Sequence, residues 1–129
     1  MDRRCFLQQS AAAVLAAVAL ASGATTAWAH HGWGWATDQE FALTGTIKAS
    51  KLGNPHGELT LDVKGEDWAV EIGQPWRNAR AGLTEKLLAA GTTVTAHGHR
   101  SANAAERLMK AERLVIAGKD YNLYPDRSS

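Results

Sequence analysis

Histidine provides the most evident chemistry in this sequence. Five histidines occur among its 129 residues. If an export signal is removed after Ala29, His30 becomes the first residue of the mature chain, and its α-amine and ring Nδ1 can chelate one metal ion together. A second imidazole would complete three nitrogens in a T shape, the arrangement known as a histidine brace. Because Cu(II) prefers imidazole nitrogen in tetragonal geometry, the sequence predicts a copper site, or one for a similar divalent metal.

The second imidazole has several candidate positions. His56 is the first choice, because its Asn-Pro-His-Gly turn would present the ring at the rim of a barrel. His31 is adjacent to His30 and could donate its ring or its backbone nitrogen. His97 and His99 lie two residues apart on a predicted strand, so both rings point to one side and could chelate a metal, although a solvated polar face is preferred for His97. The predicted metal ligands are thus His30, His31, His56 and His99.

The same histidines also have simpler interpretations. His30 and His31 could form a polar chain end that only happens to follow the cleavage site. The ring of His56 could bond a carbonyl of its own turn.

Two tryptophans follow the histidines directly. Trp33 and Trp35 lie in a glycine-rich segment, and a disordered tail would seldom keep two such large hydrophobic side chains. We expect at least one of them to pack on the barrel, which would dock His30 against its surface. The alternative is that they stack on the ring of a ligand such as a sugar.

A second binding chemistry lies in the segment QPWRNARAG. Arg77 and Arg80 are three residues apart and share a face of a helical turn, with Trp76 beside them. Such a pair could bind a carboxylate or another anion through bidentate contacts. Glu71 or Asp62 could equally pair with the arginines in a purely structural contact. The predicted metal-free ligand site comprises Trp33, Trp35, Trp76, Arg77 and Arg80.

Catalytic motifs are absent from the sequence. It contains no His-Glu-x-x-His, no Gly-x-Ser-x-Gly, no Walker loop and no dinucleotide fingerprint. The only cysteine, Cys5, lies in the predicted signal, so the mature chain has neither a disulfide nor a thiol nucleophile. We therefore expect a binding protein rather than an enzyme, with a copper oxidase built on the brace as the less favoured alternative.

Residues 1–29 are predicted to be a cleaved export signal. Arg3 and Arg4 form a basic start, the apolar run over 11–20 is too short to span a bilayer, and residues 27–29 fit the small-x-small rule for signal peptidase. The residues around the arginine pair also resemble the twin-arginine export motif. We expect a periplasmic bacterial protein, the alternative being an uncleaved anchor.

Charge limits the partners of the mature chain. Without Arg3 and Arg4 the 14 basic residues become 12, and without Asp2 the 13 acidic residues also become 12. A formally neutral chain argues against nucleic acid, because phosphate binding needs excess positive charge. The expected partners are a metal ion, a small anionic ligand or another periplasmic protein, with no membrane contact once the signal is removed.

The elements that would position these residues are mainly strands. Alternating apolar residues predict strands in EFALTGTIKAS, ELTLDVK and DWAVEI, which form a meander. The residue order of Asn54 to Gly57 is that of a type I turn. Helical turns follow, first in QPWRNARAG and then in LTEKLLAAG, with Thr84 as an N-cap and Gly91 as a stop. TTVTAHGHR and LMKAERLVI resume the strand pattern, and GKDYNLYPDR could add a short arm.

This order of elements predicts an all-β fold with a short helical connection. Three meandering strands, a helical segment and two further strands are the order of a small OB-like Greek-key barrel of five to six strands. The predicted domain organisation is a signal over 1–29, a histidine- and tryptophan-containing segment over 30–39, and one barrel domain over 40–129.

Several motifs together resemble a known family. They are His30-His31-Gly32-Trp33, Leu43-Thr44-Gly45-Thr46, Asn54-Pro55-His56, Gly73 to Gly82 with Pro75 and Arg80-Ala81-Gly82, and the strand from Gly91 to Gly98. Their order and spacing are similar to those of the small exported bacterial proteins called domain of unknown function 6152. This chain has Gly32-Trp33 where members commonly have a Ser-Phe or similar pair, and His97 where an acidic residue is common. The resemblance implies export and a small β-fold, and it supplies no activity.

Overall fold

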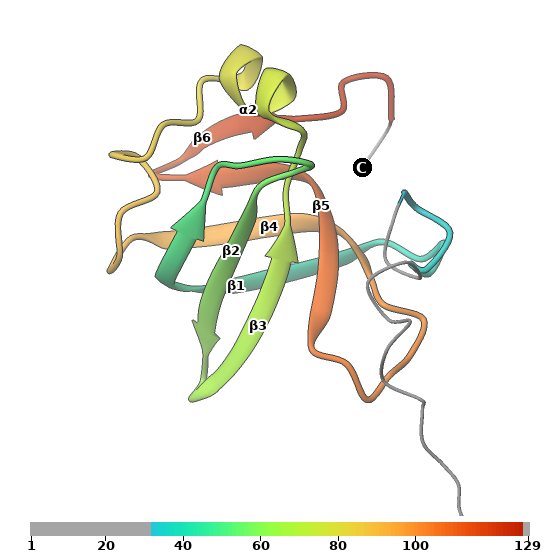
Figure 1. Ribbon diagram of the computed structural model, residues 1–129. Coiled ribbons are helices and arrows are strands. Elements are labelled where there is room, and N and C mark those ends of the chain that lie inside the picture. The colour runs from blue at the N-terminus through green and yellow to red at the C-terminus, as the bar shows by residue number, and fades with distance from the viewer. Residues whose placement is uncertain (1–31, 128–129) are drawn as a thin grey trace, which may run out of the picture. The chain divides into compact units, whose positions relative to one another are not determined.

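The computed structural model describes residues 32–127, so His30, His31 and the predicted signal lie outside the described part of the chain. Strands dominate and one short α-helix interrupts them, which confirms the predicted all-β class (Figure 1). The elements are β1 (Phe41–Lys51), β2 (Glu58–Val63), β3 (Glu66–Glu71), α2 (Pro75–Ala81), β4 (Thr93–Arg100), β5 (Leu108–Ile116) and β6 (Lys119–Asn122).

The strands close into an OB-like barrel. Their order is β3-β2-β1-β4-β5-β6, and a parallel pairing of β3 with β5 joins the two sides. β5 pairs with β4 along one edge, while its other edge pairs first with β3 at 108–110 and then with β6 at 113–116. The five-stranded barrel with one additional strand confirms the predicted architecture.

Alternation in the sequence explains the core. Over residues 41–47 of β1 and in β2 and β3, apolar residues recur at every second position and point into the barrel, because successive side chains of a strand point to opposite faces. A bulge between Ile47 and Ala49 ends this pattern in β1, and Ala49 is exposed. Val94 and Ala96 of β4 are buried in the same way. The buried hydrophobic cluster includes Leu43, Ile47, Leu59, Leu61, Trp68, Val70, Ile72, Leu83, Leu88, Met109, Ala111, Leu114, Ile116, Tyr121, Leu123 and Tyr124.

The loop between β1 and β2 differs from the prediction. A type I turn over 54–57 would be closed by a hydrogen bond from the Gly57 N–H to the Asn54 carbonyl. Instead, the Gly57 N–H donates to the Gly73 carbonyl at 2.8 Å, and the Asn54–Pro55 peptide bond is cis. A hydrogen-bonded type I turn does not form here, because the Gly57 N–H that would close it extends the pairing of β2 with β3.

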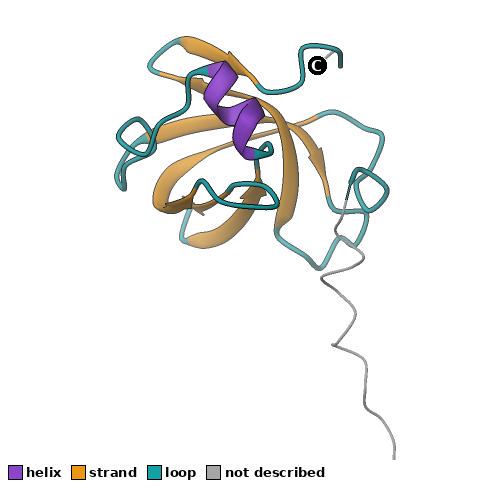
Figure 2. Ribbon diagram, turned by 45° about the horizontal axis from the view of Figure 1, so that its top comes forward, coloured by secondary structure: helices purple, strands orange, loops and turns teal. Residues whose placement is uncertain are grey.

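The helical connection follows the predicted signals. α2 begins at Pro75, whose fixed φ and missing N–H suit the first helical position, and it ends at Gly82 with φ 94°. The Leu87 N–H then donates to the Thr84 hydroxyl at 3.1 Å, which confirms the predicted cap. α2 lies over one end of the barrel (Figures 1 and 2). Within residues 32–127, no helix is long and apolar enough to cross a membrane.

Candidate metal centre

A row of charged and polar side chains crosses the outside of the barrel. Glu71 of β3 pairs in register with Lys110 of β5, and Lys110 pairs with His99 of β4. Residues paired across neighbouring strands point to the same face, so these three side chains are neighbours. All three are buried even though they face away from the core, so the outer face must be covered here.

The segment before β1 provides part of this cover. Its backbone attaches to the end of β4, where the Thr37 N–H donates to the Arg100 carbonyl and the Ala102 N–H donates to the Trp35 carbonyl, both at 2.9 Å. The Trp35 side chain is buried as a result. The predicted packing of a tryptophan on the barrel is therefore confirmed.

Trp33 packs directly over the polar row. Its ring meets His99 edge-on at 5.8 Å between centroids and Tyr124 at 5.1 Å. Two cations also face the ring, since Lys110 Nζ lies 5.0 Å and Arg127 Cζ lies 3.9 Å from its centroid. Trp33 thus excludes water from the row and ties the start of the described chain to its end.

His99 lies at the centre of a three-residue cluster. Its Nε2 is 3.3 Å from Glu40 Oε1 and 3.4 Å from Glu112 Oε2. Its Nδ1 is 3.0 Å from the Gln39 carbonyl. A neutral ring that donates from Nδ1 to this carbonyl leaves the Nε2 lone pair facing the two carboxylates, and such a bond is the usual support of a metal-binding histidine.

Within residues 32–127 this cluster is the group suited to hold a metal. One ligand atom from each of Glu40, His99 and Glu112 can be chosen so that all three lie within 4.8 Å of one another. The carboxylates repel each other, and the pKa of Glu40 is raised, first by burial and then by the charge of Glu112, while His99 opposes the rise. A cation between these groups would relieve that repulsion.

A β-bulge creates the position of Glu112. His97 pairs with Arg113 and Gly98 pairs with Ala111, so Glu112 is the extra residue of β5. β4 approaches closely at this point, because a Cβ on Gly98 would lie 2.1 Å from the Lys110 carbonyl oxygen. Bulges commonly redirect a side chain beside a functional site.

The carboxylate of Glu112 is buried and incompletely bonded. Only 1% of the residue is exposed, and its Oε1 has no hydrogen-bond partner among residues 32–127. Its Oε2 accepts a hydrogen bond from Arg127 Nε at 2.6 Å. Arg127 therefore supplies the positive charge that a buried carboxylate requires.

Two predicted metal ligands, His56 and His99, lie within the described residues 32–127, and of these two His99 belongs to this cluster. Sequence reasoning missed Glu40 and Glu112. The signal that could have suggested Glu112 is the presence of three charged residues, at 110, 112 and 113, in a strand whose other residues are apolar. Nothing in the sequence distinguishes Glu40, because a glutamate directly before a strand is ordinary.

The other histidines of the described chain lie apart. His56 Nε2 is 3.4 Å from Glu71 Oε2 and its Nδ1 is 3.2 Å from the Gly57 carbonyl, so its ring contacts the far end of the polar row. Lys110 donates to the other oxygen of Glu71. The pKa of His97 is lowered by burial and by the charge of Arg113, and its side chain remains partly exposed.

Three of the five residues of the predicted metal-free site, Trp76, Arg77 and Arg80, come together on α2, whereas Trp35 is buried elsewhere. Arg77 Cζ and Arg80 Cζ lie 4.5 Å and 5.0 Å from the Trp76 ring centroid. Each guanidinium donates to the Leu123 carbonyl, at 3.3 Å and 3.2 Å. Arg77 also lies 4.2 Å from the ring of Tyr124, which packs on Trp33.

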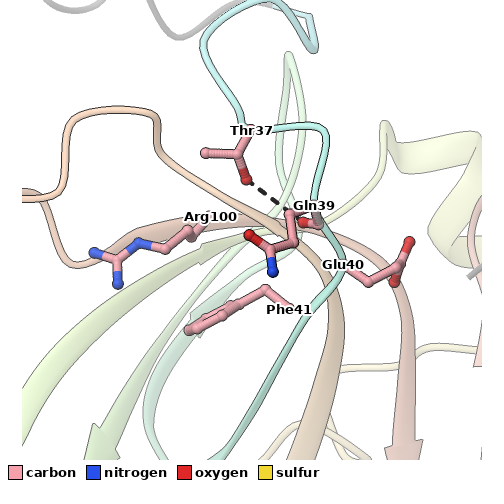
Figure 3. Close-up of a pocket in the computed structure, with 5 residues that line it drawn as sticks. All are labelled: Thr37, Gln39, Glu40, Phe41 and Arg100. Carbon is pink, nitrogen blue, oxygen red and sulfur yellow. Dashed lines mark hydrogen bonds between the residues drawn. The ribbon is translucent and has the colours of Figure 1, made fainter.

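A small cavity borders the metal cluster on the side of Glu40. Its volume is about 200 Å³, and it is lined by Thr37, Gln39, Glu40, Phe41 and Arg100. Figure 3 shows the carboxylate of Glu40 turned away from Phe41 and Arg100. Glu40 thus borders the cavity while its carboxylate belongs to the cluster with His99.

Comparison with known protein families gives a match. A model of a family of unknown function (DUF6152) matches residues 16–109. No curated protein matches the sequence.

Among solved structures, one similar chain is a ZRD-deleted mutant of TiaS in complex with agmatine. The identity is 16% and the TM-score 0.49 over 66% of this chain and 26% of that one. Another is in the S. pombe Stn1–Ten1 complex, with 16% identity and a TM-score of 0.49 over 62% of this chain and 59% of that one. This chain therefore spans less than two thirds of either protein, and nothing about their ligands transfers to it.

Proposed function

Because this chain belongs to the DUF6152 family of unknown function, its role has to come from its own residues, and we propose that it is a periplasmic binding module for a divalent metal ion, Cu(II) above all. The proposed site in the barrel consists of Glu40, His99 and Glu112. A separate contribution to Cu(II) binding, from the amine and ring of His30, is proposed from the sequence alone. The periplasmic location rests on the predicted signal over 1–29.

The observation that carries the proposal is the spacing around His99. Its Nε2 lies 3.3 Å and 3.4 Å from the two carboxylate oxygens. A charged hydrogen bond would be shorter, at about 2.7–2.9 Å. Metal–ligand bonds of about 2.1 Å in a tetrahedron place the ligand atoms about 3.4 Å from one another. The separations are therefore too long for tight hydrogen bonds and fit the edges of a tetrahedral site, the geometry of Zn(II). The preference for Cu(II) rests on the predicted N-terminal nitrogens instead.

The N-terminus supports the choice of copper. The predicted cut after Ala29 would give His30 a free α-amine beside its imidazole. One imidazole and two carboxylates alone suit Zn(II), whereas added amine and imidazole nitrogens favour Cu(II).

The remaining predicted ligands keep supporting roles in the proposal. His31 offers a further imidazole beside His30. His56 contacts Glu71 at the other end of the polar row, where it would orient the row rather than bind the metal directly.

Calorimetric titration of the mature protein with Cu(II) and Zn(II) tests the site. Glu40→Gln is the informative variant, because its side chain is 49% exposed and the fold should survive the change. We expect its metal affinity to fall at least tenfold. Glu66→Gln is the matched control, because Glu66 is exposed and its ion pair within residues 32–127 is with Arg107, away from the cluster. Equal affinities of Glu40→Gln and wild type would exclude the cluster as the binding site.

A second arm isolates the contribution of the N-terminus. Intact-mass analysis first establishes whether the exported chain begins at His30. Addition of one glycine before His30 removes the terminal chelate and leaves the cluster unchanged. We expect this variant to lose Cu(II) affinity and to keep Zn(II) affinity. Unchanged Cu(II) binding would show that the brace is not part of the site.

A further inference from the structure

The outer side of α2 carries an unusual exposed residue. Within residues 32–127, Trp76 is the large hydrophobic residue that is exposed to solvent, with an exposed fraction of 53%. Trp35, by contrast, is buried against the end of β4. Tryptophan and arginine are the residues most enriched at the energetic centres of protein interfaces. Trp76 lies between two arginines, so the composition of this surface is that of an interface.

The side chains of this surface are held in place before any partner binds. Arg77 and Arg80 lie over the Trp76 ring, and both are fixed by the Leu123 carbonyl. Asn78 locks the helix itself, since its side chain accepts from the Gly73 N–H at 2.9 Å and donates to the Gly73 carbonyl at 2.7 Å. A partner would therefore lose little affinity to the ordering of these groups.

The surface also carries uncompensated positive charge. α2 contains no acidic residue, and within the described chain no carboxylate forms an ion pair with Arg77 or Arg80. Nearby Glu71 pairs instead with Lys110 and His56. Guanidinium groups that bond only neutral carbonyl or amide oxygens retain donors for a carboxylate.

We propose that Trp76, Arg77 and Arg80 form a docking surface for a protein segment that presents carboxylates beside an apolar side chain. Charge complementarity selects the acidic partner, and Trp76 provides the apolar contact. The proposal stands apart from the metal centre, because none of these three residues belongs to the cluster around His99.

Amide chemical shifts in ¹⁵N-labelled mature protein test the surface, with defined peptides as probes. One probe is a capped peptide of alternating glutamate and leucine, and the other has glutamine in place of glutamate. We expect the acidic peptide to shift the amides of residues 75–81 and the Trp76 indole, and its affinity to be at least tenfold higher than that of the glutamine peptide. Trp76→Ala and Arg80→Gln should each weaken binding at least fivefold. Both residues are exposed, so both variants should fold.

Arg107→Gln is the matched control, since it removes one exposed arginine elsewhere and should leave binding unchanged. Equal affinity for both peptides, shifts away from α2, or no shifts at all would overturn the proposal. Shifts of α2 by an oligogalacturonate and not by the acidic peptide would also overturn it, in favour of an acidic glycan.

Discussion

Arg127 is predicted to compete with the metal for Glu112. Its Nε lies 2.6 Å from Glu112 Oε2, the same oxygen that faces His99, and its guanidinium lies 3.9 Å from the Trp33 ring centroid. Arg127 therefore acts as the resident cation of the cluster. Arg127→Gln should weaken the metal-free protein and strengthen metal binding, since the metal then neutralises Glu112 without displacing a charge.

The structure sets the size of both effects. Removing one partner of a buried pair costs about 3–5 kcal/mol, but the Arg127 side chain is 38% exposed and water screens it, so about 1–2 kcal/mol is the appropriate electrostatic share. Loss of the contact with Trp33 adds about 0.5–1 kcal/mol. Because the metal can neutralise Glu112 in the variant without displacing Arg127, the electrostatic share should appear as a metal affinity roughly 5- to 30-fold higher than that of wild type.

Urea unfolding and calorimetry measure the two quantities separately. We expect Arg127→Gln to lose about 1.5–3 kcal/mol of unfolding free energy without metal and to recover most of the electrostatic share with saturating Cu(II). The exposed Arg107→Gln should change stability by less than about 1 kcal/mol and leave metal affinity unchanged. A variant that loses stability and binds metal no more tightly than wild type would refute competition at Glu112.

Three further predictions concern the framework of the site. Gly98→Ala should cost more than about 2 kcal/mol in urea unfolding, because its Cβ would overlap the Lys110 carbonyl, whereas Gly34→Ala, with open space around it, should be nearly neutral. Burial raises the pKa of Tyr124, so the folded state keeps a proton that the unfolded state loses above about pH 10. The free energy of unfolding should therefore fall as the pH rises from there. Over this range Tyr124→Phe should lose less of its unfolding free energy than wild type. Trp35→Ala should cost about 3–5 kcal/mol by the same measurement, because the side chain is buried; a near-neutral effect would contradict its packing role.

Much of the fold was predictable, because a strand that is buried on one face has apolar residues at alternate positions of its sequence. The alternation in β1 to β3 and in β4 reports which residues face the core, and Pro75, Gly82 and Thr84 mark helical turns through local backbone chemistry. The turn over 54–57 was not predictable, because the Gly57 N–H bonds Gly73, a residue of another part of the chain.

The metal cluster shows the limit of the same reasoning. His99 was a candidate from its residue type, but Glu40 and Glu112 were not. Glu112 takes its position from a bulge in the pairing of β5 with β4. On the other edge of β5 the partner strand changes at this point from β3 to β6, and no local residue pattern predicts that change. The burial of the row depends on Trp33 and Arg127, which come from opposite ends of the described chain.

By itself, the sequence determined the strands, the helical connection, the barrel class and the family, because each depends on local periodicity, turn chemistry or ordered motifs. Only the tertiary structure decided that His99 meets Glu40 and Glu112 beneath Trp33, and that Trp76 stays exposed beside Arg77 and Arg80. The physical reason is that barrel closure and strand register bring together residues that are distant along the chain, and their mutual distances are not encoded in any one segment.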